Sequence, residues 1–358
     1  MPDSNSSYET EGQYDYSDYY NLSQFHDYGI CEKKHVRAFA RIFLPILYAF
    51  VSVLGFIGNG LLAGILIKYI KLKRMTDIYL LNLAVSDLLF VATLPFWAVY
   101  AHSEWVFGSI LCKVITLIYT INLYSSIFFI ICISMDSYLN IVWTFSTKNL
   151  KTSRKSFAIC SMVWTISILA SIPDLKFTEL QEFNGQKICI LDFGDVDMSP
   201  WRIFMKFQLN IVGFFIPFLT MVFFYSRISC VMARTRPTQK SRNPLKLAVI
   251  LVAVFFLLWF PYNLVVFLHS LQDLHLISDC NTSRHLDFAV QVTESLAFVH
   301  ACLNPILYAF VNQKFLNCLN KILKRICTKG RQYSLECTNS TPPTTQCNFI
   351  ELTVVEKL

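Results

Sequence analysis

Charged residues are scarce in this sequence. Only 15% of its 358 residues carry charge, whereas 54% are hydrophobic and 15% are aromatic. Soluble proteins usually have about 25% charged residues. The hydrophobic residues form long blocks that contain almost no charge, a pattern that excludes a disordered protein and argues against a soluble enzyme. The composition therefore predicts an integral membrane protein.

Seven of these blocks are long enough to cross a bilayer, which takes about 20 residues for roughly 30 Å of hydrocarbon. Five contain no charged residue, and two contain one acid each, Asp87 and Glu294. The blocks cover residues 42–67, 78–101, 114–135, 156–173, 207–226, 247–272 and 288–313. The predicted fold is therefore an all-α membrane protein with a bundle of seven transmembrane helices. An odd number of spans places the two ends of the chain on opposite sides.

Patterns typical of catalysis and metal binding are also lacking. No pair or trio of Cys, His or acidic residues has the spacing of metal ligands, and no catalytic constellation is present. We therefore expect no enzymatic activity. A seven-helix transporter or channel is kept as a remote alternative, but the sequence has neither an inverted repeat nor interrupted helix pairs.

The distribution of basic residues predicts the orientation. The loops at residues 68–74, 148–155 and 234–246 are basic, whereas residues 174–200 contain six acids against two lysines. Because basic loops face the cytoplasm, the N-terminus is expected outside. The first 30 residues hold no apolar run, so the first span is expected to act as its own insertion signal. The net charge of +7 then reflects topology, and no nucleic-acid partner is predicted.

Three parts of the chain are predicted: an extracellular segment (residues 1–38), a transmembrane domain (39–312), and a cytoplasmic part with a short amphipathic helix and a Ser/Thr-rich tail (313–358). The first part is acidic and rich in tyrosine, which favours a basic partner. Acids flank the candidate sulfation sites Tyr14, Tyr16, Tyr19 and Tyr20, although an unmodified acidic tail is the alternative. Candidate glycosylation sites are Asn5, Asn21 and Asn281.

Four cysteines lie on the predicted outer side: Cys31, Cys112, Cys189 and Cys280. An even number in an oxidising compartment suggests two disulfides, for which three pairings exist. A Cys112–Cys189 bond would fix the long loop to the third span, and a Cys31–Cys280 bond would close the ring of helices. On the other side, Cys327 is a candidate palmitoylation site, with an ordinary free thiol as the alternative.

Several motifs occur in order along the spans. They are Gly58-Asn59, Leu83-Ala84-Val85-Ser86-Asp87, Trp164, Pro217, Trp259-Phe260-Pro261 and Asn304-Pro305-Ile306-Leu307-Tyr308. Together they resemble a rhodopsin-class G-protein-coupled receptor over nearly the whole chain. Thr93-Leu94-Pro95, the four outer cysteines and Glu294 make the chain similar to the chemokine receptors. The stretches 171–174, 223–228, 259–264 and 286–295 resemble the atypical, scavenging members of that family.

The resemblance implies a ligand cavity in which Glu294 receives the cationic N-terminus of a chemokine. The residues that line it in the family correspond here to Tyr48, Trp97, Tyr119 and Tyr262. The family's activation core corresponds to Asp87, Ser126, Tyr225, Trp259, Pro261, Asn304, Pro305 and Tyr308. Related receptors hold a sodium ion at the positions that correspond to Asp87, Ser126 and Asn304, so the resemblance implies a candidate sodium site here. A structural polar network that includes Asn59 is the alternative.

The chain departs from the family at the end of the third span. Signalling members carry Asp-Arg-Tyr-Leu-Ala-Ile-Val there, and this chain has Asp136-Ser137-Tyr138-Leu139-Asn140-Ile141-Val142. In the family the arginine pairs with the adjacent Asp at rest and meets the G protein when active. Ser137 is uncharged and too short for either contact, so we expect coupling to be lost or severely weakened. The alternative is a signalling CC chemokine receptor with a variant motif.

The predicted function is a plasma-membrane receptor that captures inflammatory CC chemokines and cycles through endosomes. Its tail carries candidate phosphorylation sites at Ser334, Thr338, Ser340, Thr341, Thr344 and Thr345. Phosphates there would suit receptor kinases and arrestin as partners. An unmodified spacer is the alternative for this tail.

Overall fold

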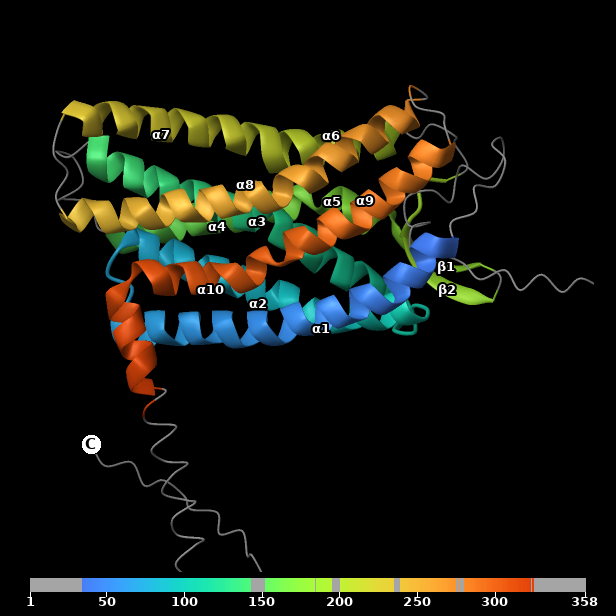
Figure 1. Cartoon of the computed structure of the whole chain (residues 1–358), viewed down its shortest axis with the longest axis horizontal. Helices are drawn as coiled ribbons and strands as arrows, with labels where there is room; N and C mark the ends of the chain where they lie inside the picture. The colour runs from blue at the N-terminus through green and yellow to red at the C-terminus, as the bar shows by residue number, and fades with distance from the viewer. Residues whose placement is uncertain are drawn as a thin grey trace, which may run out of the picture. The chain divides into compact units, whose positions relative to one another are not determined.

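A computed structural model describes residues 34–142, 152–183, 185–194, 200–234, 239–274, 276, 280–322 and 324. The chain divides into two units, Met1–Gln313 and Lys314–Leu358. Long helices of the first unit run alongside one another, with a small hairpin of strands at one end (Figure 1). We call that end the hairpin end.

The described helices and strands follow in chain order. They are α1 (Lys34–Ile65), the π-helix η3 (Leu66–Ile70), α2 (Met75–His102), α3 (Gly108–Val142), α4 (Thr152–Ala170), α5 (Ile172–Phe177), β1 (Thr178–Phe183), β2 (Gln186–Leu191), α6 (Pro200–Asn210), the π-helix η5 (Ile211–Phe215), α7 (Ile216–Arg234), α8 (Gln239–Asp273), α9 (Cys280–Phe298) and α10 (His300–Val311).

Seven membrane spans are found among the described residues, as the apolar blocks predicted. They are Phe39–Ile70, Met75–His102, Gly108–Val142, Lys155–Phe177, Pro200–Arg234, Leu245–Gln272 and Thr282–Val311. On α1 the side chains of Ile42, Ile46 and Phe50 are more than half exposed, and their spacing of four residues puts them on one face. Such an exposed apolar stripe fits contact with lipid. The orientation of the bundle stays a prediction.

The seventh span begins earlier than predicted, at Thr282 rather than residue 288. Its first turns carry the polar residues Ser283, Arg284 and Asp287, which lower the local hydropathy. The structure pairs two of them with α8: Gln272 donates to the Ser283 hydroxyl (2.9 Å), and His269 Nε2 lies 3.2 Å from Asp287 Oδ1. Contacts between helices therefore extend the span beyond its apolar block.

Two helix irregularities lie near prolines. The π-helix η5 comes directly before α7, whose second residue is Pro217. Proline has no N–H to donate and interrupts the regular hydrogen-bond ladder, and π-turns commonly absorb such interruptions. The break between α9 and α10 falls at Val299, before Pro305. The fifth span is thus built from α6, η5 and α7, and the seventh from α9 and α10.

The acidic segment between the fourth and fifth spans contains an antiparallel hairpin of β1 and β2, which the sequence analysis treated as a loop. Its register pairs Thr178 with Leu191 and Leu180 with Cys189. Gly185 adopts φ +78° at the turn, a left-handed conformation that glycine adopts without strain. Ile188, Cys189 and Ile190 of β2 are buried and β1 contacts α3, so both strands pack on the bundle.

In the second unit, residues 314–322 are helical. They fall in the stretch predicted to form an amphipathic helix. The predicted palmitoylation and phosphorylation sites of this unit lie outside the described residues.

Candidate functional site

Glu294 of α9 contacts Tyr119 of α3 across the bundle. The Tyr119 hydroxyl donates a hydrogen bond of 2.9 Å to Glu294 Oε1. A carboxylate within a membrane span is unfavourable by about 2.5–3.5 kcal/mol on insertion scales, and the phenol offsets part of that cost. The Tyr119 ring lies 6.1 Å from Phe90 and 5.7 Å from Phe298, measured between ring centroids. Glu294, the acid of the predicted ligand site, is therefore bonded to one member of a cluster of aromatic side chains.

The other three predicted ligand-site aromatics are core residues in this structure. Tyr48 is 1% exposed and packs on Phe298 at 5.6 Å, so it joins Tyr119 around the same ring. Trp97 is buried against Tyr100 and Trp105 nearer the hairpin, and Tyr262 is buried against Trp259 on α8. The structure thus brings Tyr48, Tyr119 and Glu294 together, while the ligand role of all five residues stays a prediction.

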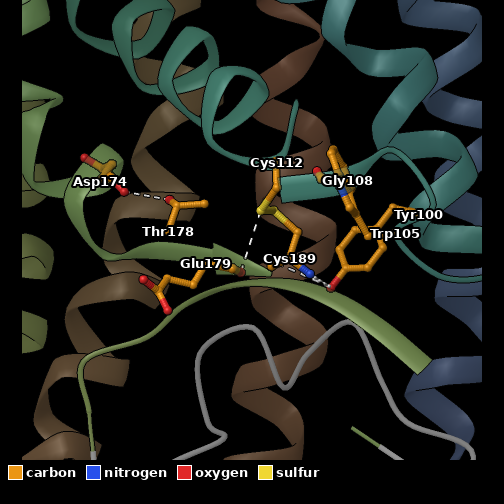
Figure 2. Close-up of a disulfide and its surroundings, with 8 residues drawn as sticks. All are labelled: Tyr100, Trp105, Gly108, Cys112, Asp174, Thr178, Glu179 and Cys189. Carbon is orange, nitrogen blue, oxygen red and sulfur yellow. Dashed lines mark hydrogen bonds between the residues drawn. A yellow bond between two sulfur atoms is a disulfide. The ribbon is translucent and has the colours of Figure 1, made fainter. Parts of the chain in front are cut away.

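A disulfide joins Cys112, at the start of α3, to Cys189 of β2, with 5.8 Å between their Cα atoms. This confirms one of the predicted pairings. Figure 2 shows the bond between α3 and the hairpin, with Tyr100 alongside; the Tyr100 hydroxyl accepts a hydrogen bond from Cys189 N (3.2 Å). The second predicted disulfide, between Cys31 and Cys280, involves side chains that the structure does not describe. A disulfide of this kind contributes about 2–4 kcal/mol and here fixes the hairpin to α3.

The turn between α2 and α3 holds the hairpin through one main-chain and one side-chain hydrogen bond. Trp105 N donates to Lys187 O, and Lys187 N donates to Glu104 Oε2, both at 2.8 Å. The Trp105 side chain is fully buried, and its Nε1 donates to Gly108 O at 2.9 Å. Trp105 was not singled out from the sequence. A large aromatic residue in the short turn between two spans was the signal for it.

Asp87 of α2 is the centre of a buried polar cluster. Its carboxylate accepts hydrogen bonds from Asn304 Nδ2 (2.7 Å), Asn122 Nδ2 (3.2 Å) and the Ser126 hydroxyl (3.5 Å). His300 Nε2 lies 3.8 Å from Asp87 Oδ1, and its Nδ1 is 2.7 Å from Ala297 O. The structure brings together the three residues singled out here. Asn122, in the middle of an apolar span, was missed.

This arrangement fits a polar network better than a sodium site. Hard cations prefer several oxygen ligands. Amide nitrogens of Asn122 and Asn304 approach the Asp87 carboxylate, and Asn122 Nδ2 also donates to the Ser86 and Ser126 hydroxyls. The oxygens of the cluster thus already accept hydrogen bonds from the protein.

Asn59 of α1 is bonded elsewhere than to Asp87. Its Nδ2 donates to Gly55 O (2.9 Å) and to Ala301 O (2.7 Å). Ala301 is four residues before Pro305, so its carbonyl is the one that proline leaves without an N–H donor. Gly58 allows the proline to approach, because a Cβ built on it would lie 2.8 Å from Pro305 Cγ. The adjacent residues Gly58 and Asn59 thus accommodate the proline of α10.

The altered motif lies at the end of α3 far from the hairpin. The Ser137 side chain is 2% exposed, and its hydroxyl donates to Ile133 O (3.1 Å) within α3. Asp136 accepts a hydrogen bond from the Thr76 hydroxyl of α2. Asn140 Nδ2 donates to Asp136 O at 2.7 Å. The Ser137 hydroxyl is therefore engaged within α3, and it does not replace the ion pair that an arginine at this position would form with Asp136.

Aromatic residues connect α3 to α7 beside this motif. The Tyr138 ring stacks on Phe224 at 5.2 Å, and the Tyr225 hydroxyl lies 3.0 Å from Ser134 Oγ. Tyr308 of α10 is buried, and its hydroxyl accepts from Asn312 Nδ2 at 2.6 Å. Tyr138 and Tyr225 thus contribute contacts between α3 and α7, whereas the hydrogen bond of Tyr308 is made to the C-cap residue of its own helix.

Several predicted sites lie outside the described residues or side chains. They are Tyr14, Tyr16, Tyr19, Tyr20, Asn5, Asn21, Cys31, Cys327, Ser334, Thr338, Ser340, Thr341, Thr344 and Thr345. Asn281 is in the first turn of α9, and its side chain is outside them too.

Seven spans, a disulfide at the hairpin end and a buried polar cluster around Asp87 define a seven-helix receptor. The family described as 7 transmembrane receptor (rhodopsin family) matches residues 58–308. Atypical chemokine receptor 2 of Mus musculus is 46% identical over 312 residues, which cover 85% of this chain and 82% of that relative.

Two human relatives are also similar. C-C chemokine receptor type 1 of Homo sapiens is 39% identical over 325 residues, covering 90% of this chain and 89% of the relative. C-C chemokine receptor type 4 of Homo sapiens is 39% identical over 294 residues, covering 82% and 81%. The chain therefore belongs to the chemokine receptors, within the rhodopsin family of G-protein-coupled receptors. Members of this family are receptors rather than enzymes, which also removes support for a transporter.

Proposed function

We propose that this chain is a scavenging receptor, which binds inflammatory CC chemokines at the plasma membrane and carries them into endosomes with little or no G-protein signalling. The observation that carries the proposal is Ser137, whose buried hydroxyl is bonded within its own helix where signalling members have arginine. The greater similarity to an atypical chemokine receptor, 46% against 39% for two CC chemokine receptors, supports it.

Ligand capture would take place in two steps. The acidic, tyrosine-rich N-terminal segment first attracts the basic body of a chemokine, which raises the rate of capture. The ligand's N-terminal ammonium then reaches Glu294 and forms a charge-assisted hydrogen bond with its carboxylate. Tyr119 holds that carboxylate in place through its hydrogen bond. Phe298 and Tyr48 supply the apolar surroundings in which such a bond is strong.

Signal output would fail at the opposite end of α3. A serine offers neither the positive charge nor the length that contact with a G protein requires in the family. Uptake would instead depend on phosphorylation of the Ser/Thr-rich tail by receptor kinases, followed by arrestin binding. Chemokine would then leave the medium without a second-messenger response.

A signalling CC chemokine receptor with a variant motif is the second candidate. The observation that favours it is the state of the remaining core: Tyr225, Asn304 and Tyr308 all form hydrogen-bonded contacts. On this reading the two changes in the motif, at Ser137 and Asn140, weaken coupling without abolishing it.

The test follows labelled CC chemokine and cyclic AMP together in cells that express the chain. Depletion of chemokine from the medium without a fall in cyclic AMP is the expected result. Depletion accompanied by a fall that blockade of inhibitory G proteins abolishes would establish the signalling candidate. If no CC chemokine binds at all, both the scavenging and the signalling candidates are overturned.

A further inference from the structure

Gln291 is a buried residue of α9 whose side chain stands out among the polar groups of the bundle. It is only 5% exposed, and neither Nε2 nor Oε1 has a hydrogen-bond partner among the described residues. Its main-chain carbonyl, in contrast, accepts a hydrogen bond of 2.6 Å from the Ser295 hydroxyl. A buried carboxamide without partners is unfavourable, and native proteins satisfy such groups.

The position of Gln291 on α9 shows where its side chain starts. It follows Asp287 by four residues and precedes Glu294 by three, so the three share one face of the helix. Asp287 is paired with His269 of α8 at 3.2 Å, and Glu294 with Tyr119 of α3 at 2.9 Å. The shared face is thus directed to the interior between α3 and α8. Gln291 occupies the gap between two partnered acids.

A carboxamide has one acceptor and two donors, which matches the C=O and N–H of a peptide unit. We propose that Gln291 hydrogen-bonds the main chain of the ligand segment that enters the bundle, next to the ammonium held by Glu294. This inference rests on the proposed function and adds a second binding residue to the same site. Three residues along a helix correspond to about 4.5 Å, and an extended peptide advances about 3.3–3.6 Å per residue. The matching unit is therefore the first or second peptide bond of the ligand.

This mode of recognition has a consequence for specificity. A main-chain contact is independent of ligand side chains, so chemokines with different N-terminal sequences would all be held by it. An ammonium at Glu294 and a peptide unit at Gln291 are features that every such ligand shares. A receptor that recognises only these shared features would bind many related chemokines.

The experiment compares the native receptor with Gln291→Met, which keeps the length of the side chain and removes its hydrogen-bonding groups. Thr293→Val is the matched control on the same helix, because the Thr293 hydroxyl already donates to Ala289 O at 2.6 Å. The ligands are one CC chemokine and versions in which an ester replaces each of its first three peptide bonds. Affinity is measured on intact cells, with receptor number determined by an antibody to an N-terminal tag.

Gln291→Met is expected to weaken binding of the native chemokine about tenfold, and Thr293→Val to leave it unchanged. One ester among the first three should weaken binding to the native receptor and have no further effect on Gln291→Met. Unchanged affinity of Gln291→Met, or equal ester effects in both receptors, would overturn the inference while leaving the proposed function intact. If Glu294→Gln also binds normally, or the native chain binds no chemokine, the proposed function fails as well.

A second measurement covers the case in which Gln291→Met does not reach the surface. Gln291→Cys is exposed to chemokines that carry a cysteine at their second or third residue, under mild oxidation. A disulfide between ligand and receptor is expected, and Thr293→Cys should form none. Equal trapping by both variants, or by neither, would count against the inference.

Discussion

The Tyr119 hydroxyl and the Glu294 carboxylate are joined by a hydrogen bond of 2.9 Å between α3 and α9. The first of these helices, α3, carries the disulfide at the hairpin end of the bundle. The second, α9, ends at the break before α10, near the middle of the seventh span. The bond therefore connects the helix that ends in the altered motif with the helix that carries the unpartnered Gln291. Its contribution can be measured directly.

Tyr119→Phe is expected to lower the free energy of unfolding by about 1–3 kcal/mol, because it leaves a buried carboxylate without its donor. Thermal unfolding of the purified receptor in detergent measures the change. Glu294→Gln removes the charge, so adding Tyr119→Phe to it should cost less than Tyr119→Phe alone. Strict additivity of the two changes would show that the bond does not contribute to stability.

Ser137→Arg is expected to produce a chemokine-dependent fall in cyclic AMP that the native chain lacks. The added guanidinium would lie beside Asp136 and supply the charge that the motif has lost. Ser137→Ala is the matched control, because it also alters the buried Ser137 side chain but adds no charge, and it should remain silent. If Ser137→Arg is well expressed and equally silent, the block to signalling lies elsewhere, with Asn140 the next residue to change.

Gly58→Ala is expected to destabilise the receptor by about 1–3 kcal/mol, since its Cβ would lie 2.8 Å from Pro305 Cγ. Gly64→Ala adds the same methyl group on α1 where no atom lies within 4 Å. It should be neutral or stabilising, because alanine favours a helix over glycine. Surface expression and thermal unfolding of the two variants give the comparison, and equal behaviour of both would contradict the close packing of α1 on α10.

Cys189→Ser is expected to abolish high-affinity chemokine binding and to cost about 2–5 kcal/mol of stability. Without the disulfide the hairpin keeps its contacts with Tyr100 and the turn at Trp105 and the packing of Ile188 and Ile190 on the core, but loses its covalent bond to α3. Cys230→Ser replaces an exposed free cysteine and should leave binding unchanged. Binding is measured with labelled chemokine on intact cells; normal binding by Cys189→Ser would show that the hairpin position does not depend on the bond.

The sequence predicted the seven spans well because each is a long apolar run, and a run is a local property. Where a span gains length from pairing between helices, as at Asp287 with His269, hydropathy alone placed the boundary too late. Asn122 was overlooked for a similar reason: its partner Asp87 lies on another helix. The β-hairpin was missed because its strands are short and few of its residues are buried, mainly Ile188, Cys189 and Ile190 of β2. Ser137 was found because resemblance to a family supplied the residue expected at that position.

The contacts of Gly58 and Asn59 with the seventh span have a consequence for biosynthesis. Asn59 lies in the first helix to enter the membrane, and its bond to Ala301 O closes with the last helix. The Asn59 amide can donate to Gly55 O within α1 from the start, but its second bond must wait until the 242 residues that separate it from Ala301 have been made. Insertion of the first span and completion of its packing are therefore separated by the synthesis of 242 of the 358 residues.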